Sequence, residues 1–153
     1  MKNKKIVLLF VVVAALLGAF YAYREYNRPP VDTAAAAPDE TLTDVALVEA
    51  FEQDEKSATG RYVNKLIRLQ GTLLALDISQ PMTAEEKESY TLVMGAKDKS
   101  TTIRCSMDSS FSPLQSPVTA GDKVMLQGVC SGYNKDELLG SDIVLVRCAL
   151  LKN

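Results

Sequence analysis

Apolar and polar residues change their spacing along the chain, and these changes divide it into distinct parts. Ile6–Tyr23 (IVLLFVVVAALLGAFYAY) carries no charge over 18 positions. Between residues 43 and 60, apolar side chains recur three and four positions apart, which is typical of an amphipathic helix. From residue 65 the spacing falls to two, and this alternation predicts β-strands.

The uncharged N-terminal run has the length of a short transmembrane helix or of the apolar core of a signal peptide. No small-x-small cleavage motif occurs in Ala19–Tyr23, which favours an anchor that is not cleaved. Lys2, Lys4 and Lys5 precede the run, and the positive-inside rule retains such residues in the cytoplasm. We therefore expect residues 1–23 to form a single-pass anchor, with the rest of the chain exported.

The segment that follows the anchor predicts a flexible linker over residues 24–41, because it is rich in proline and alanine and poor in large apolar residues. A folded domain is then expected over residues 42–153. Its first element is a helix that Thr41 or Thr43 can cap and that Gly60 ends. Asp54 lies on the apolar stripe of this helix. It is either a ligand or catalytic carboxylate, or an edge residue bonded to a nearby base or backbone amide.

The alternating part of the chain predicts five strands, over residues 65–77, 90–95, 101–107, 123–130 and 142–151. Gly71 interrupts the first and longest strand, where a glycine commonly marks a bend or bulge. The longest connections follow the first, third and fourth strands. Five strands in this order suit a small closed barrel, which conceals the edges that an open sheet would expose. The predicted fold class is therefore mainly β, with one preceding α-helix.

The domain resembles the tRNA_anti-like group of bacterial OB-fold proteins. The positions that carry the resemblance surround and interrupt the predicted strands, and they are Ala58, Tyr62, Lys65, Gly71, Cys105, Gly121, Asp122, Gly128, Cys130, Gly132 and Cys148. The resemblance implies a five-stranded Greek-key barrel of the OB type. It also implies export and attachment by a membrane helix or a lipoprotein anchor, and with the N-terminal segment we expect attachment to the bacterial inner membrane. No catalytic residue is carried over from the family.

Composition removes several kinds of chemistry. The sequence has no histidine, which excludes Ser-His-Asp and Cys-His catalysis and histidine-based zinc sites. Beyond residue 23, 14 basic residues face 19 acidic ones, a net charge of −5. The acidic groups at residues 85–88 and 136–137 stand in polar loops and are typical of solvated charge. The sequence therefore predicts no catalytic residue, no metal site and no cofactor.

The second and third strands of an OB-fold carry aromatic platforms and basic side chains when the protein binds nucleic acid. Here alternation predicts that Leu92 and Met94 face the core together with Tyr90, and that Ile103 and Cys105 do the same. The outer side of these strands then has no aromatic residue.

Three residues remain as candidates for a ligand-binding face. Arg104 is the one cation on the outer side of the two strands, and Tyr133 and Lys135 lie in the predicted loop between the fourth and fifth strands. Nucleic acid is disfavoured by this composition and by export. We expect a non-catalytic binding module for a protein, peptide or glycan. The alternatives are a nucleic-acid-binding protein and an accessory subunit of an envelope enzyme or assembly complex.

The three cysteines are each predicted on the inner face of a strand, where thiols usually serve as packing residues. In the fifth strand, alternation places Val144 and Val146 on the same face as Cys148. Export permits a disulfide, and the fourth and fifth strands are neighbours in an OB barrel. A Cys130–Cys148 disulfide and buried free thiols therefore remain open alternatives.

Overall fold

The structure is a computed structural model that describes residues 17–21, 23, 32–81, 88–95, 100–136 and 140–151. The chain divides into two compact units, Met1–Val31 and Asp32–Asn153. In the first unit, residues 17–21 and 23 are helical. Most of the predicted anchor, Ile6–Tyr23, lies outside the described residues. Within the described part of the chain, no helix has the length and apolar character needed to cross a membrane.

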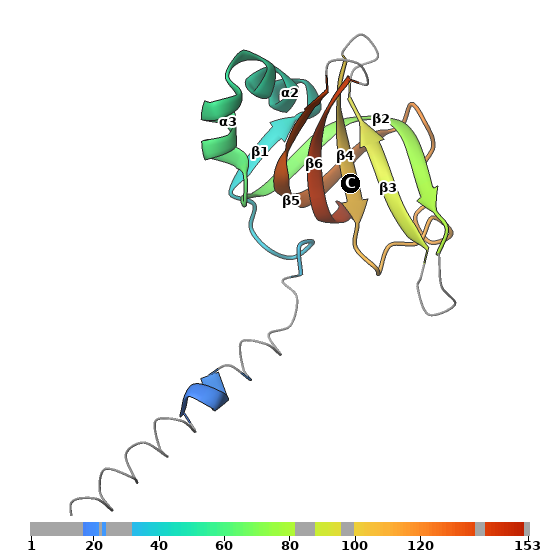
Figure 1. Ribbon diagram of the computed structural model, residues 1–153. Helices are drawn as coiled ribbons and strands as arrows, with labels where there is room; N and C mark the ends of the chain where they lie inside the picture. The colour runs from blue at the N-terminus through green and yellow to red at the C-terminus, as the bar shows by residue number, and fades with distance from the viewer. Residues whose placement is uncertain are drawn as a thin grey trace, which may run out of the picture. The chain divides into compact units, whose positions relative to one another are not determined.

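The second unit is mainly β, as predicted (Figure 1). Its described elements, in chain order, are β1 (Glu40–Thr43), α2 (Asp44–Gln53), α3 (Glu55–Tyr62), β2 (Leu66–Ser79), β3 (Ser89–Met94), β4 (Thr101–Met107), β5 (Lys123–Asp136) and β6 (Gly140–Leu151). All six strands belong to one sheet. The sheet has one strand more than the five that the sequence predicts.

Five of the strands form a closed ring of hydrogen-bonded neighbours. The order in the sheet is β1-β2-β3-β4-β6-β5, and β2 also pairs with β5. The length of β2 makes this possible, because residues 66–72 pair with β5 and residues 73–79 pair with β3. The change of partner falls between Thr72 and Leu73, one residue beyond Gly71, where the sequence predicts a bend. Within the ring, β4 and β6 are parallel and the other pairs are antiparallel.

The additional strand, β1, lies at the end of the segment predicted as a linker. It runs parallel to the start of β2, with Glu40 opposite Ile67. Just before it, the backbone N–H of Asp39 donates to the Leu66 carbonyl at 2.8 Å, and the Leu66 N–H donates to Asp39 Oδ2 at 2.8 Å. The packed unit therefore begins well before residue 42. Composition did not indicate this, because the contact depends on the free edge of β2.

Residues 32–36 also lie against the ring. The Thr33 hydroxyl donates to the backbone carbonyl of Arg147 at 2.8 Å. The side-chain amide of Gln127 donates to the carbonyls of Thr33 and Ala36, at 2.6 and 2.7 Å. This segment, called the N-terminal arm (residues 32–39), is thus held by β2, β5 and β6.

The single helix predicted over residues 43–60 is instead two helices. Asp54 separates them with a φ of −151°, and its Oδ1 accepts a hydrogen bond from the Ser57 N–H at 3.0 Å. A carboxylate that binds the free N–H groups at a helix start stabilises that start. Asp54 is therefore the N-cap of α3. Gly60 lies inside α3 and does not end it, since the helix continues to Tyr62.

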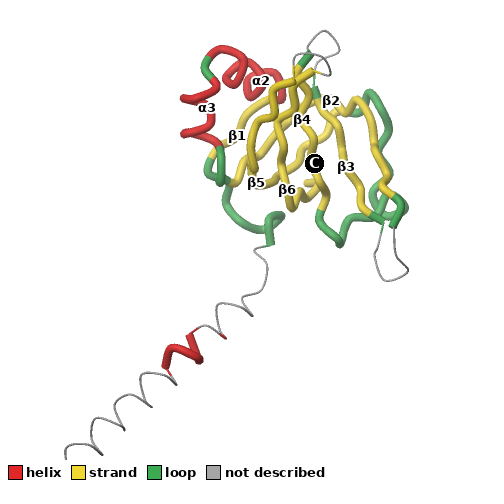
Figure 2. The backbone as a smooth tube through the Cα atoms, in the orientation of Figure 1, coloured by secondary structure: helices red, strands yellow, loops and turns green. Residues whose placement is uncertain are grey.

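The two helices lie together at one end of the ring, beside β1 (Figure 2). Leu47, Val48 and Phe51 of α2 are at most 1% exposed and belong to the same apolar cluster as the inner side chains of the strands. At the start of α2, the buried Asp44 carboxylate accepts hydrogen bonds from the backbone N–H groups of Val45 and Thr72, at 2.7 and 3.0 Å. These contacts fix α2 on β2.

Candidate functional site

The outer side of β3 and β4 is the surface on which an OB-fold would present a ligand face. The inward orientation predicted for these strands is confirmed at four positions, where the side chains are fully buried, namely Leu92, Met94, Ile103 and Cys105. Tyr90, which is predicted to face the core with them, is instead only half-buried and lines a pocket at the start of β3, where the strand extends past the core. The residues that alternate with the four buried ones include one basic residue and no aromatic one, and they are Thr91, Val93, Thr102, Arg104 and Ser106. Among the described residues of these two strands, the outer side has no aromatic ring.

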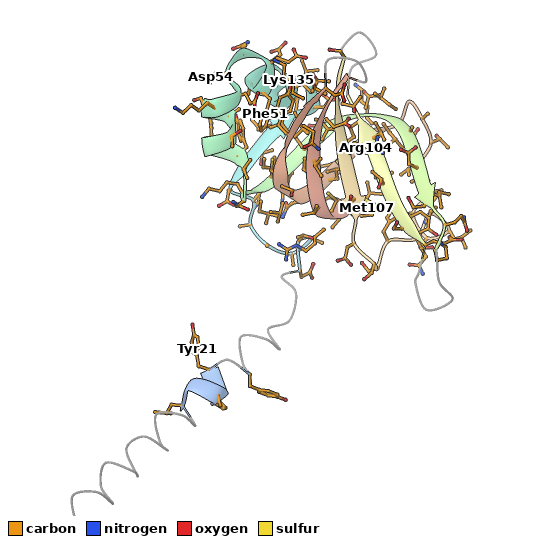
Figure 3. The ribbon with its side chains drawn as sticks, in the orientation of Figure 1. Tyr21, Phe51, Asp54, Arg104, Met107 and Lys135 are labelled. Atoms are coloured by element: carbon orange, nitrogen blue, oxygen red, sulfur yellow. The ribbon has the colours of Figure 1, made fainter. Side chains whose placement is uncertain are left out.

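Arg104 is the cation on this surface (Figure 3). Its Nη2 donates to Oδ2 of Asp77 on β2 at 3.1 Å, and the two side chains are 44% and 49% exposed. A second carboxylate lies on the neighbouring strand, where the Thr102 hydroxyl donates to Asp142 Oδ1 at 2.5 Å. Since Arg104 is paired with one carboxylate and Asp142 lies nearby on β6, the surface offers little positive potential to a phosphate.

Tyr133 and Lys135 lie in strand β5 rather than in a loop, because β5 continues to Asp136. The Tyr133 ring stacks on Phe51 of α2, with centroids 5.1 Å apart and planes 27° apart, and it packs against the core. Lys135 is exposed and lies opposite Ser141. The three predicted ligand-face residues therefore do not converge on one site. Tyr133 instead holds α2 against β5.

The three cysteines are free and fully buried. Cys130 lies opposite Leu145 of β6, so the structure contains no Cys130–Cys148 bond. The thiol of Cys148 instead contacts that of Cys105. Hydrogen bonding between these two thiols, together with burial, raises the pKa of Cys105 well above its usual value. Burial likewise raises the pKa of Cys130 to about 11. Thiols held in this state are poor nucleophiles.

Irregular pairing between β5 and β6 explains the position of Cys148. The register shifts between Gln127 and Val129, and Arg147 adopts a φ of 52° at the same level of β6. An extra residue in a strand reverses the alternation beyond it. Val144 and Val146 therefore do not share the buried face with Cys148, and this prediction is wrong. The buried residues before the irregularity are Ile143 and Leu145.

A pocket of about 480 Å³ lies where β3 begins and β4 ends. We call it the aromatic–acidic pocket. Its walls contain two aromatic rings, one methionine, two carboxylates and three serines, and the residues used below are Tyr90, Phe111, Met107, Glu88 and Asp108. Among the described residues that line it, none is basic. The volume is in the range typical of ligand pockets.

The aromatic rings of this pocket are held in a defined arrangement. Tyr90 and Phe111 form an edge-to-face pair with centroids 5.7 Å apart and an interplanar angle of 72°. The Tyr90 hydroxyl donates to Glu88 Oε2 at 2.7 Å, and this hydrogen bond raises the pKa of Tyr90. Asp108 Oδ1 accepts the Ser110 N–H at 3.0 Å, which shapes the turn that carries Phe111.

The sequence did not reveal this pocket, because its residues come from two loops and two strand ends. Glu88 belongs to the group that the sequence predicts as solvated charge, and Phe111 lies between two predicted strands, in a segment with prolines at 113 and 117. The sequence does show a carboxylate close to an aromatic residue at each of two strand ends. Glu88 precedes Tyr90 by two positions, and Asp108 precedes Phe111 by three. Such pairs are common in loops, so they become informative only when the strands bring them together.

The arrangement presents aromatic faces and negative charge to a ligand. Within the described residues, no group of three or more Cys, Asp or Glu side chains is placed to hold a metal ion. The aromatic faces offer contact area and a negative quadrupole, while the two carboxylates add negative charge. A positively charged, partly apolar group would satisfy both features.

Comparisons with known proteins concern the family and the fold. The tRNA_anti-like family model matches residues 1–150. No curated protein matches the chain. A solved lipoprotein from Klebsiella pneumoniae subsp. pneumoniae MGH 78578, described as a candidate nucleic acid-binding protein, has a TM-score of 0.56 and 12% identity, and the match covers 82% of this chain and 100% of that chain. The yeast Stn1 and Ten1 structure has a TM-score of 0.39 and 15% identity, covering 82% and 68%.

Proposed function

Because the chain belongs to the tRNA_anti-like family, we propose that it is a non-catalytic binding module built on a five-stranded Greek-key barrel of the OB type. The closed ring β2-β3-β4-β6-β5 supports the barrel. The ligand in this proposal is a segment of a protein or peptide that carries a lysine or arginine side chain. The aromatic–acidic pocket receives that side chain.

The composition of the pocket is the observation that carries this proposal. Tyr90 and Phe111 can contact the aliphatic stem of a basic side chain and attract its charge through their ring faces. Glu88 and Asp108 can accept charge-assisted hydrogen bonds from its terminal nitrogen atoms. A phosphate or nucleotide would meet two carboxylates, and no cation is among the described lining residues.

Nucleic acid is the alternative that the OB fold suggests, and two features oppose it. Binding to phosphate backbones rests on clustered Lys and Arg, whereas Arg104 is paired with Asp77. Stacking of bases requires exposed aromatic platforms, and the described outer side of β3 and β4 lacks them. The likeness to the Klebsiella lipoprotein bears on the fold and leaves this comparison of side chains unchanged.

We further propose that Ile6–Tyr23 anchors the module in the bacterial inner membrane, with the N-terminus in the cytoplasm and the barrel outside it. The uncharged run and the preceding lysines support this orientation. The basic segment would then belong to an extracytoplasmic partner, which includes the case of an accessory subunit in an envelope complex. Protease added to intact spheroplasts is expected to digest the barrel and spare an N-terminal tag.

A binding measurement on the full-length chain in nanodiscs tests the function. A lysine-containing peptide is expected to bind, and its counterpart with acetylated lysine is expected to bind about tenfold less, because acetylation removes the charge. Glu88→Gln and Phe111→Ala should each weaken binding of the lysine peptide. Glu49→Gln, an exposed carboxylate on α2, is the matched control and should have no effect.

Two results would contradict the proposal. One is equal binding of the lysine and acetyl-lysine peptides by the wild-type chain. The other is tight binding of single-stranded RNA that falls steeply with added salt, which is the signature of phosphate contacts. That second result would favour the nucleic-acid alternative.

A further inference from the structure

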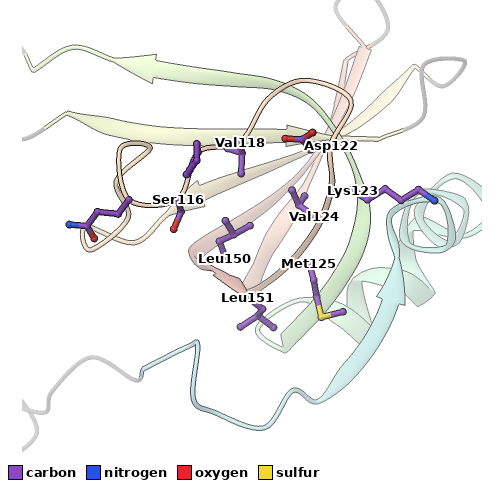
Figure 4. Close-up of a pocket in the computed structure, with 10 residues that line it drawn as sticks. Ser116, Val118, Asp122, Lys123, Val124, Met125, Leu150 and Leu151 are labelled. Atoms are coloured by element: carbon purple, nitrogen blue, oxygen red, sulfur yellow. The ribbon is translucent and has the colours of Figure 1, made fainter. Parts of the chain in front are cut away.

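A second pocket, of about 400 Å³, lies between the loop that joins β4 to β5 and the ends of β5 and β6 (Figure 4). We call it the loop pocket. Its apolar walls are Val118 of the loop, Val124 and Met125 at the start of β5, and Leu150 at the end of β6. Val118 and Leu150 also pack against the core cluster, so the floor of the pocket is continuous with the core.

The same loop carries the most exposed large apolar side chain among the described residues. Leu114 is 96% exposed. It is held on a defined turn, since the N–H groups of Gln115 and Ser116 both donate to the Ser112 carbonyl at 3.0 Å. Prolines at 113 and 117 flank the turn and restrict its backbone. A leucine presented on an ordered turn loses little conformational entropy when it is buried against a partner.

The rim of the loop pocket carries one charge of each sign, Asp122 and Lys123. The Asp122 Oδ2 accepts hydrogen bonds from the backbone N–H and the hydroxyl of Thr119, at 2.8 and 2.9 Å, and so fixes the end of the loop. An anionic or cationic ligand would meet a rim of no net charge. A surface with adjacent opposite charges is instead complementary to itself when a two-fold axis places each charge opposite the other.

We propose that this face binds a second copy of the chain. Leu114 of each copy enters the loop pocket of the other, and Asp122 of each copy lies opposite Lys123 of the other. The projecting leucine and the pocket belong to the same loop, since Gln115 and Ser116, which follow Leu114, line the pocket. A two-fold interface requires that both partners use the same patch, and this loop would supply both halves of the contact. The interface is small, so the dimer is weak and concentration-dependent. It does not involve the aromatic–acidic pocket, and it stands independently of the ligand proposed there.

Crosslinking of the full-length chain in vesicles tests the dimer. Isotopically light and heavy chains are mixed and treated with a carbodiimide, which joins a carboxylate to an amine that it contacts. We expect mixed light–heavy crosslinks between Asp122 and Lys123. Leu114→Asp should abolish them. Val45→Asp, which replaces another exposed apolar residue at the start of α2, should retain them.

Sedimentation equilibrium in detergent micelles measures the dimer association constant. Leu114→Asp should lower the dimer association constant by about a hundredfold, because burial of each of the two leucines contributes about a factor of ten. Equal association of the wild type and Leu114→Asp would overturn the proposal, and so would crosslinks confined to single chains. Photolabelling of Val118 or Leu150 by a diazirine-bearing laurate in a chain that stays monomeric would also overturn it, since the pocket would then hold a small amphiphile.

Discussion

Gln127 shows how a single polar residue can hold two distant parts of the chain together. It is completely buried, and its amide nitrogen donates to the Thr33 and Ala36 carbonyls. Its Oε1 accepts from Arg68 Nε at 2.9 Å. Buried polar groups are costly unless they are hydrogen-bonded, and here each end of the amide has a partner. The N-terminal arm therefore depends on one side chain of β5.

Replacing this residue should release the arm. In Gln127→Leu the Thr33 and Ala36 carbonyls lose their donor, and we expect a loss of about 2–3 kcal/mol in the free energy of unfolding. Urea unfolding of the full-length chain in micelles measures this loss. Gln70→Leu, at an exposed position of β2, is the control and should change stability by less than about 0.5 kcal/mol. Equal effects of the two substitutions would show that the arm does not depend on Gln127.

The junction of α2 with β2 is the clearest case at the scale of elements. The Asp44 carboxylate occupies the space beside Gly71, and a Cβ at residue 71 would overlap it. Because Asp44 also accepts the Thr72 N–H, the carboxylate cannot move away without loss of that bond. Gly71 is therefore required for close approach rather than for a special backbone angle. The bend that the sequence predicts at Gly71 is accompanied by this helix contact.

Gly71→Ala should consequently destabilise the domain. We expect a loss of about 1–3 kcal/mol, the range for a methyl group forced into filled space. Gly132→Ala in β5 is the matched control, because no atom lies within 4 Å of a Cβ built there. Thermal unfolding of both variants compares the two positions. A Gly71→Ala chain as stable as Gly132→Ala would mean that α2 shifts freely on β2.

At the scale of the whole molecule, one core joins the ring to α2 and contains all three thiols. Cys105, Cys130 and Cys148 come from three different strands and are each 0% exposed. The pKa of Cys105 is raised by its hydrogen bond with Cys148 and by burial, and the pKa of Cys130 is raised by burial, so both environments favour the neutral thiol. A group whose folded-state pKa is raised stabilises the fold below its unfolded pKa, and this contribution is lost as the pH rises through the folded value.

Stability should therefore fall with rising pH between 9.0, the usual thiol value, and about 11, the pKa of Cys130. Unfolding midpoints measured under reducing conditions across this range test the effect. In Cys130→Ala the decline should be shallower, because one of the thiols no longer titrates on unfolding. Identical pH profiles for the two chains would contradict the contribution of Cys130.

The sequence alone determined what depends on local patterns. The two-residue period was sufficient for the inner side chains of β3 and β4 from Leu92 to Cys105, because neither strand contains an extra residue there. It failed at Tyr90, because the start of β3 lies beyond the core. The sequence also indicated a mainly β domain and a bend in β2 at Gly71. The match of the family model to residues 1–150 confirms the family resemblance. These features follow from side-chain alternation and from residues whose backbone preferences act within a few positions.

The tertiary structure decided whatever depends on contacts between distant segments. The break at Asp54 required a side-chain cap rather than a change in apolar spacing, and β1 required the free edge of β2. Irregular pairing in β5 and β6 reversed the faces around Cys148 and brought it to Cys105. The aromatic–acidic pocket exists because two strand ends meet, and the loop pocket because the β4–β5 connection crosses the end of the ring. The spacing of residues along the chain does not predict such contacts, because strand register and packing set their geometry.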